Sequence, residues 1–368
     1  MISKALVVGA YHKKNSELAN FGIDLHLIVP RTWGRQKPEV IEASNYTIHL
    51  LPIFFSGKNH FHFYQGLKSL VDSINPDIIH IDEEPYSLVT YQASRIAKEK
   101  NIPTLFFTWQ NIKKKYPFPF SALERYAFDN AHAAIAGNLE ASDVMREKGF
   151  SKKIFIVPQF GVDPQIYSKR DAGSLKVQLF GASNVQVIGY VGRFVEEKGI
   201  QTLLQAFSKL DRTARLFLIG SGPYKKKILE TSGILDINDR LQMPGDVPSD
   251  KIPLYLNCLD CFVLPSLTRP NWKEQFGRVL IEAMSCGVPV IGSDSGEIPN
   301  VIGDAGLIFN EGDADDLLRK MEIILNDQIL KEQYRRRGRS RVIEHFTQKH
   351  IAEQTLKVYE FILQRRNV

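Results

Sequence analysis

The sequence predicts an α/β protein of two domains, each built on a doubly wound parallel sheet. The chain has 368 residues, which is long for one hydrophobic core and suits two domains of ordinary size. Short apolar runs alternate with amphipathic helical stretches along nearly the whole chain, as they do in α/β folds. The alternation weakens over residues 166–185, which contain Gly173 and Gly181 and are typical of an interdomain linker.

The first half, residues 1–165, predicts an N-terminal Rossmann-like domain. Its short apolar runs predict strands at Ala5–Val8, Leu25–Val29, Thr47–Leu51, Asp77–Ile81, Thr104–Phe107, Ala133–Ala136 and Ile154–Val157. Helical periodicity between these strands predicts helices at Phe63–Ser73, Ser87–Lys100, Phe120–Asp129 and Leu139–Lys148. Strands that are joined by helices of this length pair in parallel.

The second half, residues 186–347, predicts a C-terminal Rossmann-like domain. Its strands are expected at Val187–Val191, Arg215–Ile219, Leu241–Met243, Cys261–Leu264, Val288–Ile291 and Leu307–Phe309. The tail from about Asp313 has a helical pattern, and we expect its last helix, at about 348–368, to pack back on the N-terminal domain. Two domains that face each other across a cleft are the simplest account, with ligands beyond the carboxyl ends of the strands.

Composition and charge exclude several classes of protein. Hydrophobic residues make up 43% and charged residues 24% of the chain, which excludes a mainly disordered protein. A net charge of +6 suits nucleotide diphosphates, anionic lipids or nucleic acids without choosing among them. No apolar run approaches the roughly 20 residues of a membrane-spanning helix. Because Met1–Ala10 also lacks the layout of a signal peptide, we expect a cytoplasmic protein.

Three clusters of reactive or charged residues favour structural roles. Cys258 and Cys261 form a lone C-x-x-C in a chain with three cysteines, so core packing in a reducing compartment is favoured over a zinc site. Asp313 and Asp315 have metal-like spacing, but they precede a helix and more simply cap it. The basic run Arg335–Arg341 suits a solvated helix end, with binding of an anionic lipid or polymer as the alternative.

Two cations follow the first strand of the second half. Gly192 permits a tight turn after residues 187–191, and Arg193 and Lys198 then place positive charge just beyond the strand end. That arrangement suits a diphosphate, whose developing negative charge must be stabilised as it leaves. Surface salt bridges with the two glutamates between these cations are the alternative.

Two carboxylates accompany an apolar helix at residues 279–286. Glu282 lies within that helix, where a carboxylate is costly unless it is paired or bound to a ligand. Glu274 lies eight residues earlier, and Gly277 lets a ligand approach the helix start, where unpaired N–H groups suit a phosphate. The alternative is structural: one carboxylate stabilises the dipole at the helix N-terminus, and the other is a core carboxylate whose hydrogen bonds are satisfied.

These motifs together resemble glycosyltransferase family four. The resemblance rests on Gly192-Arg193, Lys198-Gly199 and Glu274-x7-Glu282 within EQFGRVLIEAMSCGVPVIGSDSGEIPNVI, and on the segments Gly220-Ser221-Gly222-Pro223 and Leu264-Pro265-Ser266. Fainter similarity in the first half lies in Ala131–Gly137 and Pro158–Asp163. The resemblance implies the GT-B fold, transfer of a hexose from a nucleotide-diphosphate sugar, and retention of anomeric configuration.

The resemblance also implies roles for single residues. Arg193 and Lys198 would bind the donor diphosphate, Glu274 the sugar hydroxyls and Glu282 the ribose. Glu274, Arg193 and Lys198 are therefore the expected catalytic residues. Gly277 and Arg278 would add backbone N–H groups, and the backbone near Met243 and Gly245 would contact the base. The other residues expected to bind the donor are Gly222 and Phe276.

The first half departs from the family pattern at two places. No second glycine follows Gly9 after the first predicted strand, where the family usually has a glycine-rich loop. The family often has a histidine after a mid-domain strand, but here Trp109, Gln110 and Asn111 follow Thr108. These three residues are substrate-binding candidates by position, with ordinary loop packing as the alternative.

Acceptor contacts are expected from the first domain. Glu83 and Glu84 follow a strand, where a carboxylate orients an acceptor hydroxyl or acts as a base, with surface exposure as the alternative. His12 and His80 favour structural over catalytic roles. The segment Ile112–Phe120, IKKKYPFPF, mixes cations with aromatics as interfacial segments do, with an exposed loop as the alternative.

The resemblance therefore implies a retaining hexosyltransferase of polysaccharide biosynthesis. The expected donor is a UDP-sugar, with UDP-glucose as the first choice, and the acceptor a saccharide or a lipid-linked saccharide at the inner face of the membrane. No metal, cofactor or nucleic acid is expected, because two cations and a helix N-terminus stabilise the leaving diphosphate. A nucleotide-sugar binder without turnover and a nucleotide-sugar epimerase remain alternatives; a dehydrogenase is disfavoured because G-x-G-x-x-G is missing after either first strand.

Overall fold

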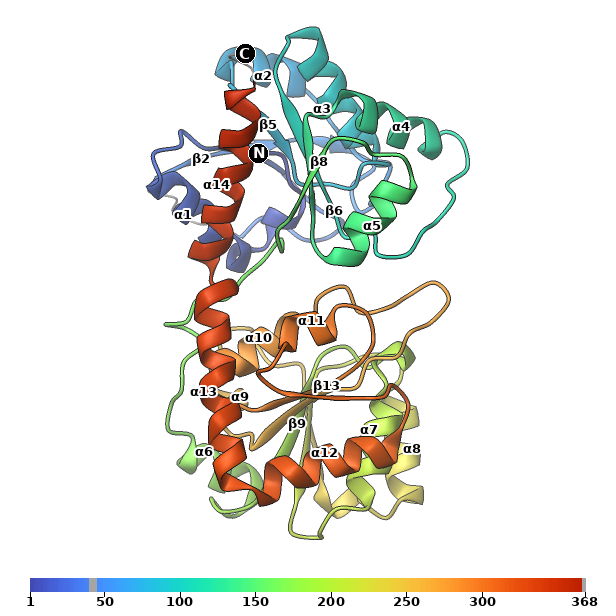
Figure 1. Cartoon of the computed structure of the whole chain (residues 1–368), viewed down its shortest axis with the longest axis vertical. Coiled ribbons are helices and arrows are strands. Elements are labelled where there is room, and N and C mark those ends of the chain that lie inside the picture. The colour runs from blue at the N-terminus through green and yellow to red at the C-terminus, as the bar shows by residue number, and fades with distance from the viewer. Residues whose placement is uncertain (40–44, 366–368) are drawn as a thin grey trace. The chain divides into compact units, whose positions relative to one another are not determined.

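The computed structural model describes residues 1–39 and 45–365 and divides the chain into two compact units (Figure 1). The N-terminal unit consists of Met1–Phe160 and Gln348–Val368, and the C-terminal unit is Gly161–Thr347. The chain thus enters the second unit once and returns to the first at its end. Each unit has parallel strands covered by helices, as the sequence predicts.

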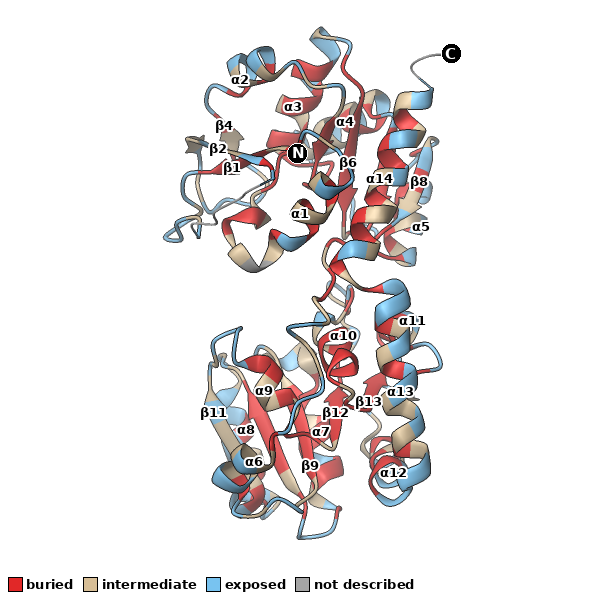
Figure 2. Cartoon of the chain, turned by 90° about the vertical axis from the view of Figure 1, so that its left-hand side faces the viewer, coloured by how far each residue is buried: buried red, intermediate tan, exposed pale blue. Residues whose placement is uncertain are grey.

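The C-terminal unit is built on one six-stranded parallel sheet. Its strands are β9 (Val187–Val191), β10 (Arg215–Ile219), β11 (Leu241–Gly245), β12 (Cys261–Leu264), β13 (Val290–Ser293) and β14 (Leu307–Phe309). Their spatial order is β11-β10-β9-β12-β13-β14, with all neighbours parallel. This is the doubly wound Rossmann order, and it reverses between β9 and β12, where such sheets bind ligands. Figure 2 shows β9, β12 and β13 as buried strands and the edge strand β11 as half-buried.

Helices cover both faces of this sheet. They are α6 (Gly173–Phe180), α7 (Ile200–Ser208), α8 (Lys225–Ile234), α9 (Ile252–Leu256), α10 (Arg278–Ser285), α11 (Ile298–Ile302), α12 (Ala314–Asn326) and α13 (Gln328–His345). The side chain of Asp313 accepts hydrogen bonds from the backbone N–H groups of Asp315 and Asp316, so the predicted cap of α12 is confirmed.

The stretch that was expected to be a linker, residues 166–185, contains helix α6 and lies within the C-terminal unit. Phe180 of this helix packs edge-to-face on Phe217, with ring centroids 5.3 Å apart. Lys176 pairs with Asp260, Nζ to Oδ2, at 2.7 Å. The linker prediction is therefore wrong over these residues, because polar and glycine residues obscured a short helix that buries Phe180 against the sheet.

The N-terminal unit has a parallel sheet in two parts. Its strands are β1 (His26–Pro30), β2 (Thr47–Leu51), β5 (Ile79–Ile81), β6 (Thr104–Thr108), β7 (Ala133–Ala136) and β8 (Lys153–Ile156), with a small antiparallel hairpin of β3 (Ile53–Phe54) and β4 (Phe63–Tyr64). The pairs are β1-β2 and β5-β6-β7-β8, and Ile2 bridges Ile28 and Ile81 between them. Its helices are α1 (Lys13–Asn20), α2 (Leu67–Ile74), α3 (Leu88–Glu99), α4 (Phe120–Asn130), α5 (Leu139–Glu147) and α14 (Gln348–Gln364).

Two predicted elements of this unit differ from the structure. The strand expected at Ala5–Val8 is wrong, since the chain there forms two 3₁₀ turns, Ala5–Val7 and Gly9–Tyr11. An apolar run of that length does not distinguish a buried strand from a buried turn. The helix expected at Phe63–Ser73 begins only at Leu67, because its first two residues pair in the β3-β4 hairpin.

Helix α14 supplies part of the apolar core of the N-terminal unit. Ile351, Val358 and Tyr359 are buried in one cluster with Leu18 of α1 and Leu105 of β6. The buried stripe on α14 is visible in Figure 2. The last helix of the chain therefore completes the first unit rather than extending the second.

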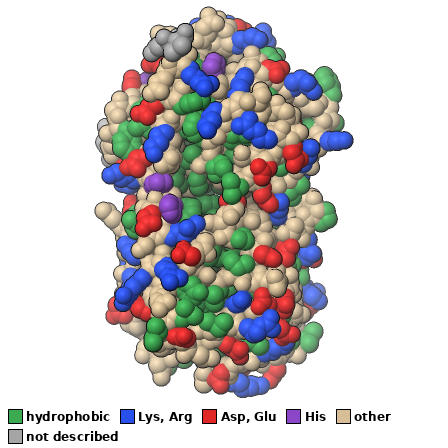
Figure 3. All heavy atoms as spheres, viewed as in Figure 1, with side chains coloured by type: hydrophobic (Ala, Val, Ile, Leu, Met, Phe, Trp, Pro, Cys, Tyr) green, Lys and Arg blue, Asp and Glu red, His purple; other side chains and the backbone are tan. Residues whose placement is uncertain are grey.

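Surface and thiol features agree with an ordinary α/β protein. Lys and Arg side chains are interspersed with Asp and Glu on the face drawn in Figure 3. Cys258, Cys261 and Cys286 are buried free thiols, so the core-packing prediction is confirmed, and burial raises the pKa of Cys258 to about 11. Within residues 1–39 and 45–365, the helices are all too short or too polar to cross a bilayer.

Candidate active site

Two loops meet at the carboxyl edge of the C-terminal sheet, where the strand order reverses. One follows β9 and the other follows β12. Gly199, in the first loop, has φ +64°, and a Cβ on it would lie 1.8 Å from the carbonyl oxygen of Pro265 in the second. The backbone N–H of Leu267 donates to the carbonyl of Glu197 at 2.8 Å. Only glycine permits this approach, which brings the charged groups of both loops together.

Lys198 and Glu274 form an ion pair where these loops meet. The Nζ of Lys198 lies 2.5 Å from Oε2 of Glu274, and the hydroxyl of Ser266 donates to the same oxygen at 2.8 Å. Glu274 is only 7% exposed. The ammonium of Lys198 also lies 5.0 Å from the ring centroid of Trp272. The structure thus joins two of the three predicted catalytic residues.

Arg193, the third, extends from the β9 loop into solvent. Its side chain is 72% exposed, and its Nη2 lies 4.0 Å from Oε1 of Glu197, which is a long ion pair. The hydroxyl of Tyr190 donates to its backbone carbonyl at 2.9 Å and fixes the turn. Burial raises the pKa of Tyr190, and the nearby charge of Glu274 raises it further. Arg193 is therefore an exposed cation on an anchored backbone.

Helix α10 begins beside the Lys198–Glu274 pair. Its N-cap is Gly277, with φ +78°, and a Cβ there would lie 2.8 Å from Cδ2 of Leu264. The positive end of the helix dipole thus lies three residues after Glu274 in the chain. Phe276 is buried and packs on Phe346, with centroids 5.8 Å apart, so its side chain anchors the loop in the core.

Glu282 is buried one turn further along α10. Its Oε1 lies 3.0 Å from Nε of Arg278, and Tyr167 hydrogen bonds to the carboxylate. Burial raises the pKa of Glu282, against the opposing charge of Arg278. Arg278 was expected to contribute its backbone N–H, and the structure shows its side chain engaged with Glu282.

Met243 and Gly245, expected near the base, and Gly222, expected to bind the donor, lie on the β10–β11 side of the same edge. Gly222 has φ +155°, and a Cβ there would lie 2.3 Å from the carbonyl oxygen of Phe194. Met243 is half-buried in β11, and the carbonyl of Gly245 accepts a hydrogen bond from Gly220 N at 2.9 Å. The loops after β9, β10 and β11 are therefore joined at one edge of the sheet.

In the N-terminal unit, Glu83 is buried and Glu84 is half-buried, so the alternative of surface exposure is wrong. Glu83 forms an ion pair with Lys4 and accepts the backbone N–H of Lys4 at 2.8 Å. Glu84 accepts hydrogen bonds from the hydroxyl of Thr108 at 2.6 Å and from Trp109 N at 2.9 Å. Burial raises the pKa of both carboxyl groups. Glu84 thus ties the ends of β5 and β6 together, and Glu83 holds the N-terminal segment beside them.

The three candidates after β6 are all held by side-chain partners. The indole N–H of Trp109 donates to Oε1 of Gln159 at 2.9 Å, and its ring fills the space a Cβ on Gly137 would need. Gln110 accepts from Lys148 at 3.1 Å. Asn111 donates to Glu140 at 3.2 Å. These contacts give each residue a packing role at the carboxyl edge of the sheet.

The predicted structural histidines are confirmed. His80 is buried, its Nδ1 lies 2.8 Å from the hydroxyl of Tyr359, and burial lowers its pKa to about 3. His12 lies between Leu6 and Tyr46, 2.7 Å from the carbonyl of the first and 2.9 Å from the hydroxyl of the second.

The basic run lies in α13 and is not simply a solvated helix end. Arg339 donates to the carbonyl of Ser285, which ends α10, and Arg341 donates to carbonyls of Asn300 and Val301 in α11 at 2.6 and 2.8 Å. Cations at helix C-termini stabilise the helix dipole. These two arginines therefore attach α13 to its neighbours.

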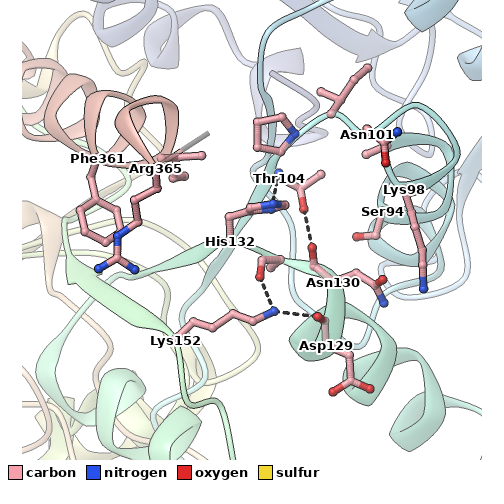
Figure 4. Close-up of a pocket in the computed structure, with 15 residues that line it drawn as sticks. Ser94, Lys98, Asn101, Thr104, Asp129, Asn130, His132, Lys152, Phe361 and Arg365 are labelled. Carbon is pink, nitrogen blue, oxygen red and sulfur yellow. Dashed lines mark hydrogen bonds between the residues drawn. The ribbon is translucent and has the colours of Figure 1, made fainter. Parts of the chain in front are cut away.

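A pocket of about 570 Å³ opens at the opposite, amino edge of the N-terminal sheet (Figure 4). It lies between the starts of β6 and β7 and the end of α14, which carries Phe361 and Arg365. Lys152 points to the end of α4, where its Nζ donates to the carbonyls of Asp129 at 2.7 Å and Ala131 at 2.6 Å. Its charge therefore stabilises a helix C-terminus, and the pocket lies away from the predicted site residues.

Ser266 and Trp272 are not among the site residues predicted from the sequence. Ser266 directly follows β12, so its position at a strand end was a usable signal. Trp272 is a large aromatic residue in a polar loop two residues before Glu274. Among the described residues, no cluster of His, Cys, Asp and Glu has the composition of a metal site.

Sequence comparisons identify the chain's relatives. Residues 175–341 match the family model described as glycosyl transferases group 1, and residues 16–165 match the model of glycosyltransferase family 4. N-acetyl-alpha-D-glucosaminyl L-malate synthase of Bacillus anthracis is 30% identical over 300 residues, which are 78% of this chain and 76% of that protein. The capsular polysaccharide biosynthesis glycosyltransferase CapM of Staphylococcus aureus is 36% identical over 189 residues, 48% of this chain and 46% of that protein.

Solved structures show the same fold. Anabaena Alr3699/HepE in complex with UDP superimposes with a TM-score of 0.78 at 17% identity, covering 98% of each chain. Sucrose-phosphate synthase from Thermosynechococcus elongatus has a TM-score of 0.75 at 19% identity, covering 96% of this chain and 92% of that one. The chain therefore belongs to glycosyltransferase family 4 and has its GT-B fold.

Proposed function

We propose that this glycosyltransferase moves a hexose from a UDP-sugar, with retention of configuration, to a saccharide or lipid-linked saccharide in polysaccharide synthesis. The observation that carries the proposal is the Lys198–Glu274 pair with Ser266, at the point where the order of the C-terminal sheet reverses. A buried carboxylate and a cation at this point suit a sugar that is attached to a diphosphate.

Lys198 and Glu274 neutralise each other when no ligand is bound. When the donor binds, Lys198 contacts its phosphate and Glu274 its sugar. Phosphate oxygens compete with Glu274 for the ammonium of Lys198, since both bind it through charge-assisted hydrogen bonds. Glu274 then accepts hydrogen bonds from hydroxyls of the hexose. The exposed Arg193 supplies a second cation to the diphosphate, and Glu282 binds the ribose.

The transfer needs no nucleophile from the enzyme. The bond between the anomeric carbon and the β-phosphate oxygen breaks, and the acceptor oxygen attacks the same face of the sugar. The proton of the acceptor hydroxyl passes to the departing phosphate oxygen, so the products are UDP and the retained glycoside. Arg193, Lys198 and the start of α10 stabilise the charge that develops on the diphosphate. Activity should therefore persist in EDTA.

The acceptor is assigned to the N-terminal unit. Glu83, Trp109, Gln110 and Asn111 lie at or next to the carboxyl ends of β5 and β6, where a ligand of a parallel sheet binds. HepE, a structural neighbour, is solved with UDP-glucose, and CapM, a relative, belongs to capsular polysaccharide biosynthesis. Both support a UDP-hexose donor and a polysaccharide product for this chain.

Replacing Glu274 tests the proposal. Glu274→Ala should lower the rate of UDP release from the preferred donor by about a hundredfold or more, because it removes a contact to the reacting sugar. UDP itself should still bind, which calorimetry measures. Glu230→Ala, at an exposed position of α8, is the matched control and should behave as wild type.

A panel of UDP-, GDP- and ADP-sugars with saccharide acceptors then identifies the donor. UDP release with a new glycoside supports transfer. Isomerised donor without a new glycoside would instead identify an epimerase, and a thermal shift without any product would identify a binding protein. Full activity of Glu274→Ala would refute the assignment of the site.

A further inference from the structure

Two loops of the N-terminal unit expose aromatic rings to solvent. The first is residues 52–64, which include the β3-β4 hairpin, and the second is residues 112–123, between β6 and the first turn of α4. Phe118 is 84% exposed, Phe55 61% and Phe61 51%. Such exposure is unusual for phenylalanine, and exposed apolar patches commonly mark interaction sites.

A ring contact joins the two loops. Phe61 of the first packs edge-to-face on Phe120 of the second, with centroids 5.0 Å apart. The residues come from opposite ends of a segment that spans α2, β5, α3 and β6, so the sequence does not bring them together. The loops therefore form one surface, here named the aromatic–basic surface and defined as residues 52–64 and 112–123.

The surface carries positive charge and no acidic residue. It contains Lys58, Lys113, Lys114 and Lys115, and neither loop contains Asp or Glu. All four lysines are exposed. Glu147 of α5 lies 3.1 Å from Lys113, which partly offsets one of the charges. On the face drawn in Figure 3, Lys and Arg side chains lie among Asp and Glu side chains.

Neighbouring contacts hold the second loop in place. Tyr116 packs on Tyr86 in a tilted arrangement, with centroids 4.2 Å apart, and the ammonium of Lys148 lies 4.5 Å from the centroid of the Tyr116 ring. Figure 1 shows this loop as the long connection that leads into α4. Because Tyr116 is anchored, the lysines before it and Phe118 after it are presented outward from a fixed point.

We propose that the aromatic–basic surface docks the protein on an anionic lipid bilayer. Aromatic rings are favoured at the headgroup level of a membrane, and lysines near that level are attracted to anionic headgroups. Each feature alone binds weakly, and the two together give stable but reversible association. The inference rests on the N-terminal unit alone and holds whether or not the proposed donor chemistry does.

Vesicle flotation tests the docking. The intact protein should float with vesicles of phosphatidylcholine and phosphatidylglycerol at low salt, and much less with phosphatidylcholine alone. Binding should fall as salt rises, because screening weakens attraction to the headgroups. Failure to float with anionic vesicles, or equal binding to both compositions, would overturn the proposal.

Variants locate the binding surface. Changing Lys113, Lys114 and Lys115 together to Ser should weaken binding to anionic vesicles by at least about tenfold. Phe118→Ser should weaken it by about threefold or more. Phe118 is mostly exposed, so this variant should fold normally. UDP binding, measured by calorimetry, should be unchanged in both variants.

The C-terminal unit offers matched controls. Lys225, Lys226 and Lys227 form a second lysine run in α8, and Ile234 of the same helix is 81% exposed. Changing that run to Ser, or Ile234→Ser, should leave flotation unchanged. An equal loss in the controls would overturn the proposal, as would a dimer in sedimentation that Phe118→Ser dissociates, since a second copy would then cover the surface.

Discussion

Lys198 contacts two neighbours of different chemistry. In the proposed function, each affects how Lys198 binds the donor diphosphate. Glu274 binds its charge, and the Trp272 ring lies against its ammonium at 5.0 Å. An ammonium over an indole face is attracted without losing its hydrogen-bond donors. Trp272 therefore orients Lys198 while leaving it able to exchange Glu274 for a phosphate.

Trp272→Ala should weaken UDP binding by about threefold, because an exposed cation–π contact contributes about 0.5–1 kcal/mol. Trp272→Tyr keeps an aromatic face and should recover most of the affinity. Calorimetric titration with UDP measures both. If the alanine and tyrosine variants bind alike, the ring does not act through Lys198.

At the scale of elements, Asp260 connects two helices to the C-terminal sheet. Its carboxylate lies 2.7 Å from Nζ of Lys176 in α6 and 2.6 Å from Nζ of Lys331 in α13, and it accepts the backbone N–H of Val187 at 3.0 Å. Burial opposes its ionisation, but the two lysines outweigh burial and hold the pKa of Asp260 below its ordinary value. One carboxylate thus attaches α6 and α13 to the start of β9.

Asp260→Asn should lower the free energy of unfolding at pH 7 by about 3 kcal/mol, because Lys331 is left buried without its counter-charge. Urea denaturation measures the change. Asp315→Asn, which breaks an exposed pair with Lys209, is the control and should cost less than about 1 kcal/mol.

The same variant has a predictable pH dependence. The folded-state pKa of Asp260 lies below the ordinary value of 3.8, so its contribution is complete above that pH and is lost as the pH falls through the folded-state pKa. The difference between wild type and Asp260→Asn should therefore shrink in acid. A difference that grew in acid would contradict this account of Asp260.

Helix α14 is attached to the N-terminal sheet by a histidine. His80 of β5 hydrogen bonds to the hydroxyl of Tyr359, and burial lowers its pKa from 6.5 to about 3, although the charge of Asp82 opposes that shift. Below pH 6.5 His80 therefore binds a proton in the unfolded chain but stays neutral in the folded protein. The contribution of His80 to stability is complete above pH 6.5 and declines as the pH falls.

His80→Gln should destabilise the protein at pH 7 by about 1 kcal/mol through the lost hydrogen bond. Its stability should depend less on pH, so wild type should lose about 2 kcal/mol relative to the variant between pH 7 and pH 5. Chemical denaturation at the two pH values measures this. Parallel pH profiles would show that folding does not lower the pKa of His80.

At the scale of the whole molecule, the two units have separate cores, and the first needs both ends of the chain. Residues 161–347 include every strand and helix of the C-terminal unit, whereas residues 1–160 lack α14 and its buried Ile351, Val358 and Tyr359. Without α14, the apolar side chains that it covers, such as Leu18 of α1, would be exposed to solvent.

Residues 161–347 produced alone should fold cooperatively, because a core of this size suffices for a domain. The Kd of this fragment for UDP should lie within about tenfold of that of the full chain. Residues 1–160 alone should aggregate or unfold at a lower urea concentration. Circular dichroism with urea titration, and calorimetry with UDP, test the two fragments. A stable, monomeric fragment 1–160 would show that α14 is dispensable.

The sequence by itself determined the fold class, most strands and the local motif from Glu274 to Glu282. The strands at Val187–Val191, Arg215–Ile219, Cys261–Leu264 and Leu307–Phe309 begin and end at the predicted residues. Strands of a parallel sheet are buried on both faces, so each is a continuous apolar run that sequence reveals. The motif from Glu274 to Glu282 is equally local, because its residues share one loop and one helix.

The tertiary structure alone decided what depends on partners far along the chain. Glu83 is buried because Lys4, 79 residues earlier, neutralises it, and Lys198 meets Glu274 across 76 residues. Phe61 meets Phe120 in the same way. Local patterns report only which side chains are apolar or charged, whereas burial and pairing are set by which elements the sheet order places side by side.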